Sequence, residues 1–251
     1  MIQLVTRADD AGSCTSANRA ITQTVEASVI KNVSFMAVGP HIEEATQLLA
    51  GRADICCGLH VTLNAEWHEV KWKPLTQTDT LTEVSGNFLP FPHDTKAFWG
   101  AAGVTAEVAA QVEAELEAQL QKLRDLGIQI SYFDEHMGVS WIGLREIFSA
   151  FCQQHDLLDV YDVPGMPDIK MDADDLEQLK ARLQQAPGRC VWVTHPGMDL
   201  PDMKRFYLSG ETPGTVARER DAERRLLLDP RLPELLHQME VSVCRYDELA
   251  K

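Results

Sequence analysis

Short apolar runs alternate with amphipathic segments of helical period along the whole chain. The runs are mostly continuous rather than alternating, which is typical of parallel strands covered on both faces. Because strand and helix patterns alternate without a break in composition, we expect a single domain over residues 1–251 with a parallel sheet. The predicted strands are Ile2–Thr6, Val33–Val38, Ile55–Leu63, Ile128–Phe133, Leu157–Val163, Cys190–Thr194 and Val241–Tyr246.

The clearest helix is predicted between Thr105 and Leu126, where apolar residues recur at about every fourth position and Gly127 supplies a C-terminal stop. Asp172 is the predicted N-cap of a second clear helix, which continues through leucines at helical spacing. The remaining predicted helices are Ser16–Ile30, Ile42–Leu49, Ile142–His155 and Val216–Leu228.

Two segments, Ala65–Trp99 and Pro196–Pro213, break this rhythm and show little periodicity. Long irregular loops are uncommon in compact domains and are often functional, so we expect both to lie around a site. The chain also lacks a G-x-G-x-x-G motif after its first strand, which argues against a dinucleotide-binding open sheet.

Composition narrows the classes of partner. The 251 residues are 45% hydrophobic and carry a net charge of −15, which argues against a nucleic acid or an anionic membrane as partner. We find neither an apolar run long enough to span a bilayer nor a secretory signal. The six cysteines have no C-x-x-C spacing, so we interpret them as reduced residues of a cytoplasmic protein.

Candidate catalytic residues gather where the predicted strands end. His60, His136 and His195 lie at or just beyond three strand ends, and Asp9 and Asp10 follow the first strand. In a parallel (β/α) barrel all the carboxyl ends of the strands open onto one face, where active sites are built. We therefore expect these five side chains to share one rim.

Each residue also has an ordinary structural interpretation. Asp9 and Asp10 suit a turn or a helix N-cap, and a single histidine at a strand end is usually a hydrogen-bonded core or surface residue. The coincidence at four strand ends favours a site for a divalent ion, because one carboxylate and two imidazoles leave positions free for water and substrate. Asp134, two residues before His136, is placed to orient a ligand.

At these positions the sequence resembles the YdjC-like carbohydrate deacetylases, of the chito-oligosaccharide deacetylase type. The matching motifs appear in the same order over nearly the whole chain. They are "RADDAG" from residue 7, "GLHVTL" from 58, "FDEHMG" from 133, "THPG" from 194 and "VSVCRYDEL" from 241. The resemblance implies a distorted TIM-like (β/α) barrel related to polysaccharide deacetylases, with about seven parallel strands.

The resemblance also implies a metal-dependent hydrolase that removes an N-acetyl group from an amino sugar or a short chito-oligosaccharide. Carried over by motif, Asp10, His60 and His136 are the metal ligands, Asp9 the general base and His195 the general acid. The expected cofactor is a divalent ion, Mg²⁺ or Zn²⁺; ligand softness favours Zn²⁺, Co²⁺ or Mn²⁺ over Mg²⁺. The expected partner is a small acetylated sugar, with a homo-oligomer compatible with the sequence.

Two other functions remain open at this point. A metal-dependent isomerase or aldolase on a similar barrel would need the same ligands but would release no acetate. A sugar-binding barrel without catalysis would tolerate the loss of Asp9 or His195, and both are present. The loop aromatic residues Trp67, Trp72, Phe91 and Trp99 are candidates for stacking on sugar rings.

Overall fold

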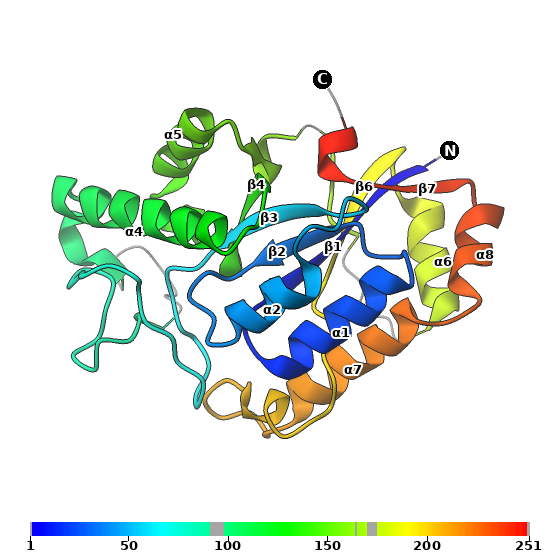
Figure 1. Cartoon of the computed structure of the whole chain (residues 1–251), viewed down its shortest axis with the longest axis horizontal. Coiled ribbons are helices and arrows are strands. Elements are labelled where there is room, and N and C mark those ends of the chain that lie inside the picture. The colour runs from blue at the N-terminus through cyan, green and yellow to red at the C-terminus, as the bar shows by residue number, and fades with distance from the viewer. Residues whose placement is uncertain (1, 91–97, 164, 170–174, 250–251) are drawn as a thin grey trace.

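Parallel strands form one curled sheet at the centre of the protein (Figure 1). We describe it from a computed structural model that covers residues 2–90, 98–163, 165–169 and 175–249. Within these residues the sheet has seven strands in the order β5-β4-β3-β2-β1-β6, with β7 also paired to β1. The strands are β1 (Ile2–Ala11), β2 (Asn32–Phe35), β3 (Cys56–Val61), β4 (Ile130–Glu135), β5 (Leu158–Asp159), β6 (Arg189–Thr194) and β7 (Val241–Cys244).

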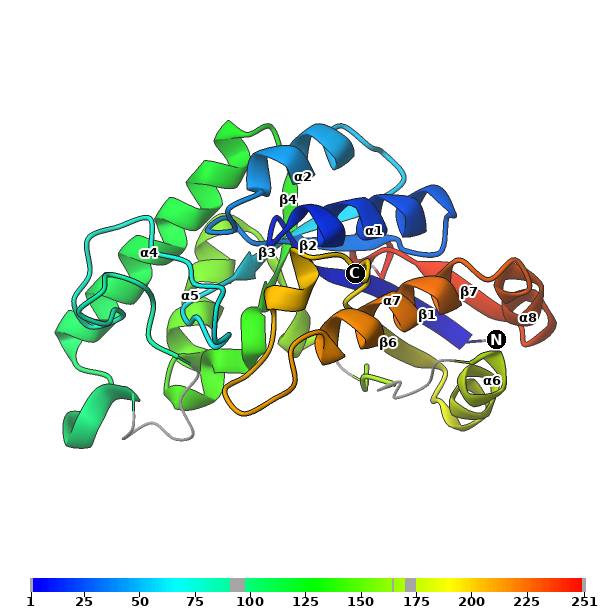
Figure 2. The same cartoon turned by 90° about the horizontal axis from the view of Figure 1, so that it is seen from below.

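Helices cover the outside of this sheet. α1 and α7 lie side by side, with α2 next to α1, whereas α4 and α5 cover the β3–β4 end (Figures 1 and 2). On α4 five apolar side chains are fully or almost fully buried, each worth about 1.5–3 kcal/mol by transfer from water. The helices are α1 (Thr15–Glu26), α2 (Ile42–Leu49), α4 (Ala106–Asp125), α5 (Arg145–His155), α6 (Leu176–Gln185), α7 (Thr215–Leu227) and α8 (Leu232–Gln238).

The sheet is a half-barrel rather than a closed ring. β1 pairs along one edge with β6, and its other edge is shared by β7 near Ile2–Val5 and β2 near Arg7–Ala11. Among the described residues β5 and β6 do not pair, and β6 instead forms a single parallel bridge between Val191 and Asp168. The expected distorted (β/α) barrel is therefore confirmed, with an opening between β5 and β6.

All seven predicted strands are present, with different ends: β1 continues five residues past Thr6 to Ala11, β2 ends at Phe35 rather than Val38, and β4 is shifted two residues later. The fifth strand was predicted too long. Leu157–Val163 contains only the two-residue strand β5, followed by a 3₁₀ turn at Val160–Asp162. The side chain of Asp159 accepts a hydrogen bond from the Tyr161 amide at 3.0 Å, which starts the turn and ends the strand.

The other corrections concern helix ends. α6 begins at Leu176 with Asp175 as its N-cap, so the N-cap was wrongly predicted at Asp172, which itself lies outside the described residues. The helix predicted over Ile142–His155 starts three residues late, at Arg145, because Gly143 adopts a left-handed conformation (φ 97°). The N-terminal half of α8 contains Pro233, and this short helix was missed.

Buried polar side chains on α4 form hydrogen bonds with the irregular segment that begins at Ala65 and with the end of β3. The Glu115 carboxylate accepts hydrogen bonds from the backbone amides of Leu75 and Thr76 at 3.0 and 2.9 Å. Gln119 links the same carboxylate to Thr62, just after β3. These buried contacts satisfy loop amides that would otherwise lose their hydrogen bonds to water, so they fix the loop against the sheet.

No helix in the described ranges is long and apolar enough to cross a membrane. The six cysteines all lie within those ranges and are free thiols, five of them buried.

Candidate metal centre and active site

The end of β1 turns both of its acids toward one cavity. Successive side chains of a regular strand point to opposite faces, so Asp9 and Asp10 would normally diverge. Here the pairing of β1 with β2 shifts register between Ala8 and Ala11, and Asp10 adopts a left-handed conformation with φ 66°. Asp tolerates this conformation better than most residues. As a result, both carboxylates are buried and line the same cavity.

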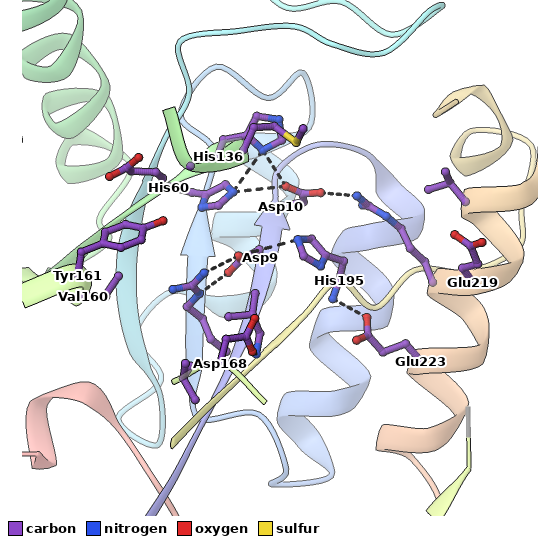
Figure 3. A pocket seen from close by; sticks show the side chains of 18 of the residues that line it. Asp9, Asp10, His60, His136, Val160, Tyr161, Asp168, His195, Glu219 and Glu223 are labelled. Atoms are coloured by element: carbon purple, nitrogen blue, oxygen red, sulfur yellow. Dashed lines mark hydrogen bonds and ion pairs between the residues drawn. The ribbon is translucent and has the colours of Figure 1, made fainter. Parts of the chain in front are cut away.

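Three donor atoms converge on one point at the ends of β1, β3 and β4 (Figure 3). Oδ1 of Asp10 lies 3.5 Å from Nε2 of His60 and 3.4 Å from Nδ1 of His136, and the two ring nitrogens are 3.3 Å apart. Ligands about 2.0–2.1 Å from a tetrahedral ion are separated by about 3.3–3.4 Å, so this triangle has the size that such an ion requires. Within the described residues Oδ1 of Asp10 is buried and has no hydrogen-bond partner.

Two carboxylates orient the imidazoles toward this point. Nδ1 of His60 lies 3.0 Å from Oδ2 of Asp134, and Nε2 of His136 lies 3.0 Å from Oε1 of Glu66. Because an ionised carboxylate only accepts hydrogen bonds, these ring nitrogens carry protons, and the opposite nitrogens are the ones that would bind an ion after giving up theirs. The contact between Asp134 and His60 agrees with the expectation that Asp134 orients a ligand. Glu66, in the loop after β3, was not predicted.

A second group of donors, Asp9, His60 and Asp134, is also close enough to hold an ion. However, the guanidinium of Arg7 already lies between the two acids. It contacts the Asp9 carboxylate at 2.7 and 2.8 Å in a two-pronged ion pair, and it lies 3.2 Å from Asp134. Arg7 therefore supplies the positive charge in that position, which leaves the triangle of Asp10, His60 and His136 as the candidate metal site.

Each acid of the doublet has its own arginine. Burial alone would raise the pKa of Asp9, but Arg7 together with His60 and His195 outweighs burial and lowers that pKa to about 2. Burial would likewise raise the pKa of Asp10, yet Arg220, 2.7 Å from Oδ2, helps to hold it well below its usual value. Both carboxylates are thus ionised at neutral pH despite being adjacent.

The two imidazoles hold protons strongly. Burial would lower the pKa of His60, but the surrounding carboxylates, Asp134 first, raise it to about 10. For His136 the same opposition, led by Glu66, gives a pKa of about 9. A metal ion at this site has to compete with these protons, so its binding weakens as pH falls.

His195 follows β6 and faces Asp9 across the cavity floor. Its Nε2 lies 3.9 Å from Oδ2 of Asp9, and 42% of its side chain is exposed. Partial removal from water lowers the pKa of His195, against the opposing influence of Asp10 and Asp9. The backbone N–H of His195 donates to Glu223 at 2.5 Å, which ties this strand end to α7. A weakly held proton suits a group that has to donate one.

The cavity over these residues has a volume of about 1020 Å³, which is large enough for a sugar of one or two rings. Of the two irregular segments, the first lines the cavity through Trp67, and the second reaches it only indirectly, through the edge-on packing of Phe206 against Trp67. The proposed stacking role of the loop tryptophans is not supported for two of them. Trp67 and Trp72 are only 8% and 3% exposed, because their rings pack under the loops.

The other two candidates for stacking are Phe91 and Trp99. Phe91 lies outside the described residues. The indole N–H of Trp99 donates to the Ile142 carbonyl at 2.9 Å, so that ring is an anchor for the preceding loop. The half-exposed aromatic side chain that does line the cavity is Tyr161.

Solved structures support the fold assignment. A protein of Enterococcus faecalis, solved as a candidate cellobiose-phosphate cleavage protein, shares 15% identity with a TM-score of 0.76 and covers 100% of this chain and 99% of its own. Two variants of a CE4 family pseudoenzyme, one with restored enzymatic activity, give TM-scores of 0.52 and 0.51 at 9% and 10% identity. Each covers 98% of this chain and 66% of its own. These likenesses concern the fold alone.

The sequence comparisons give a family. No curated protein matched the chain. A model of the YdjC-like protein family, however, matches residues 3–238, and that span contains the ends of β1, β3, β4 and β6 that carry the site. The chain therefore belongs to the YdjC-like family.

Proposed function

We propose that this protein is a metal-dependent hydrolase that removes the acetyl group from an N-acetylated amino sugar or a short chito-oligosaccharide. The observation that carries the proposal is the triangle formed by Asp10, His60 and His136, next to the Asp9–His195 pair in one cavity. Family membership and a half-barrel like that of the CE4 proteins support it.

The proposed roles divide between holding an ion and moving protons. A divalent ion held by Asp10, His60 and His136 would supply a Lewis acid to polarise the acetyl carbonyl and activate water. Asp9 accepts the proton of the attacking water at its carboxylate, which Arg7 keeps ionised and fixed in orientation. His195 donates the proton that the departing amine needs, and its exposed ring can recover one from solvent.

The direct test combines metal analysis with acetate release. Protein dialysed against Zn²⁺ or Mg²⁺ should retain about one ion per chain at pH 8.5 and less at pH 6, because the ion has to displace imidazole protons and this competition grows as the pH falls. The loaded protein should then release acetate from N-acetylated mono- or disaccharides. The name of the Enterococcus protein makes phosphorylated disaccharides useful additional substrates. Metal binding with sugar conversion but without acetate would instead favour an isomerase or aldolase.

Tyr161 is the proposed contact for a second sugar ring. It lines the cavity and is 51% exposed, and Figure 3 shows its ring on the side of the cavity away from His195. The Arg145 guanidinium lies 5.7 Å from the centre of the ring and steadies it. Pairs of aromatic rings gain about 0.5–1.5 kcal/mol beyond the area that they bury, and we take the same range for Tyr161 stacked on the apolar face of a sugar.

Tyr161→Ala should therefore raise KM for an N-acetylated disaccharide by about two- to tenfold, because the stacking energy is lost. Tyr161→Phe keeps the ring and should leave KM nearly unchanged. Trp141→Ala is the matched control, because Trp141 is 46% exposed but does not line the cavity. Steady-state kinetics on the disaccharide would check this, and an unchanged KM for Tyr161→Ala would rule out the contact.

A further inference from the structure

Arg220 reaches the candidate metal site from α7, far along the chain from the three donor residues. Its side chain is buried, with the residue 8% exposed, and Nη2 lies 2.7 Å from Oδ2 of Asp10. The guanidinium lies against two aromatic rings, 5.7 Å from the centre of Trp67 and 5.9 Å from that of Phe206. Nη1 is buried and has no hydrogen-bond partner within the described residues. These rings fix the position of the guanidinium.

The contact divides the two oxygens of Asp10 between different tasks. Oδ2 is taken by Arg220, and Oδ1 faces His60 and His136. A planar guanidinium packed against aromatic rings restricts rotation of the carboxylate that it binds. Asp10 is therefore presented as a ligand through one oxygen in a fixed direction.

The backbone of α7 is joined to the site as well. The Arg220 carbonyl accepts a hydrogen bond from the Gly197 amide at 3.2 Å. A Cβ atom at Gly197 would lie 2.7 Å from Cε of Met203 and 3.1 Å from Cβ of Arg220, so a larger residue would require Met203 to move and would crowd Arg220. One turn later, Glu223 accepts the amide of His195. The Thr-His-Pro-Gly segment and Arg220 are thus held together.

We infer that Arg220 is a positioning residue of the metal site, which holds Asp10 so that Oδ1 alone is offered to the ion. The inference rests on the proposed function. Removing Arg220 would change metal affinity in opposite directions, depending on whether Arg220 acts through its charge or through the position that it gives Asp10. A nearby guanidinium repels a metal ion, so if Arg220 acted only through charge, its removal would strengthen metal binding. If Arg220 orients the ligand, its removal must weaken metal binding.

The test is metal affinity, measured for Zn²⁺ alone by competition with a chromophoric chelator. Arg220→Met should weaken Zn²⁺ binding by about 10–100-fold, the range found when groups that orient metal ligands are removed. Arg225→Met is the control on the same helix. It removes the same charge from a side chain that is 65% exposed and pairs with Asp221, and its affinity should stay within about twofold of wild type.

Arg220→Lys separates charge from geometry. It keeps the positive charge but loses the planar fork, so it should also bind Zn²⁺ more weakly than wild type. With Co²⁺ in place of Zn²⁺, both Arg220 variants should show an altered visible absorption spectrum, since the ligand geometry has changed. If Arg220→Met does not fold, as judged by thermal melting, Arg220→Lys decides the question.

Two outcomes distinguish a failure of this inference from a failure of the proposed function. Zn²⁺ binding by the Arg220 variants that is equal to or tighter than wild type would overturn the positioning role and leave the proposed function standing. A wild-type protein that binds no Zn²⁺ would overturn the proposed function itself and this inference with it.

Discussion

Asp9→Asn is expected to lower turnover by about 10²–10⁴-fold while the metal stays bound, because a neutral amide cannot accept the proton that a general base takes up. The fold should survive, since the Asn side-chain oxygen can still accept one hydrogen bond from Arg7 and Arg7 keeps its contact with Asp134. The measurement is kcat for acetate release together with the metal content of the same sample.

Two outcomes would contradict this role. Wild-type turnover in Asp9→Asn would show that the proton goes elsewhere. Loss of metal from this variant would show that Asp9 is itself a ligand, and the base would then have to be sought at His195. Asp134 is a weaker candidate, because it is fully buried and held by Arg7 and His60 rather than lining the cavity.

Asp10→Asn should behave differently, with metal affinity falling by more than about 100-fold. An amide oxygen is a poorer donor than a carboxylate for a divalent ion, and loss of a ligand should exceed the 10–100-fold effect of losing an orienting group. Turnover should fall with the metal. Equilibrium dialysis against Zn²⁺ followed by elemental analysis would measure it.

The matched control is Asp125→Asn at the exposed end of α4, which makes the same change in charge and shape far from the site. It should bind metal and turn over like wild type. Asp10→Asn that retains a full complement of metal would remove Asp10 from the ligand set. Unfolding of Asp10→Asn would mean that the acid serves mainly to neutralise the buried Arg220.

Sequence reasoning found the strands and the donor residues for one physical reason. Parallel strands buried on both faces are continuous apolar runs, and their carboxyl ends must meet at one edge. A polar residue directly after such a run, such as His60 or Asp10, is therefore placed by the fold class alone. The length of β5 was missed because the turn after it depends on a single hydrogen bond, which the Asp159 side chain accepts from the Tyr161 amide.

The groups that surround the donors could not be found in this way. Glu66 comes from an irregular loop whose path is set by contacts with α4, and Arg220 comes from the outer layer of helices. Neither position follows from the period of a strand or helix. Arg7 was visible beside the doublet, but its ion pairs depend on the local turn of β1. The buried state of Trp67 and Trp72 likewise depends on how the two loops pack.

The ion pairs around the donor residues affect which metal ion the protein would contain in a cell. Asp9, Asp10, Asp134 and Glu66 each have a partner on the chain itself, so the ligands do not rely on an ion to hold them in place. Because the donors are already in place, folding around the ion does little to select one metal over another. Affinity among divalent ions then follows the general order, in which binding strengthens along the first-row metals and is tightest for Cu²⁺. The ion recovered from an expression host should accordingly reflect the supply of metals during growth together with this general order.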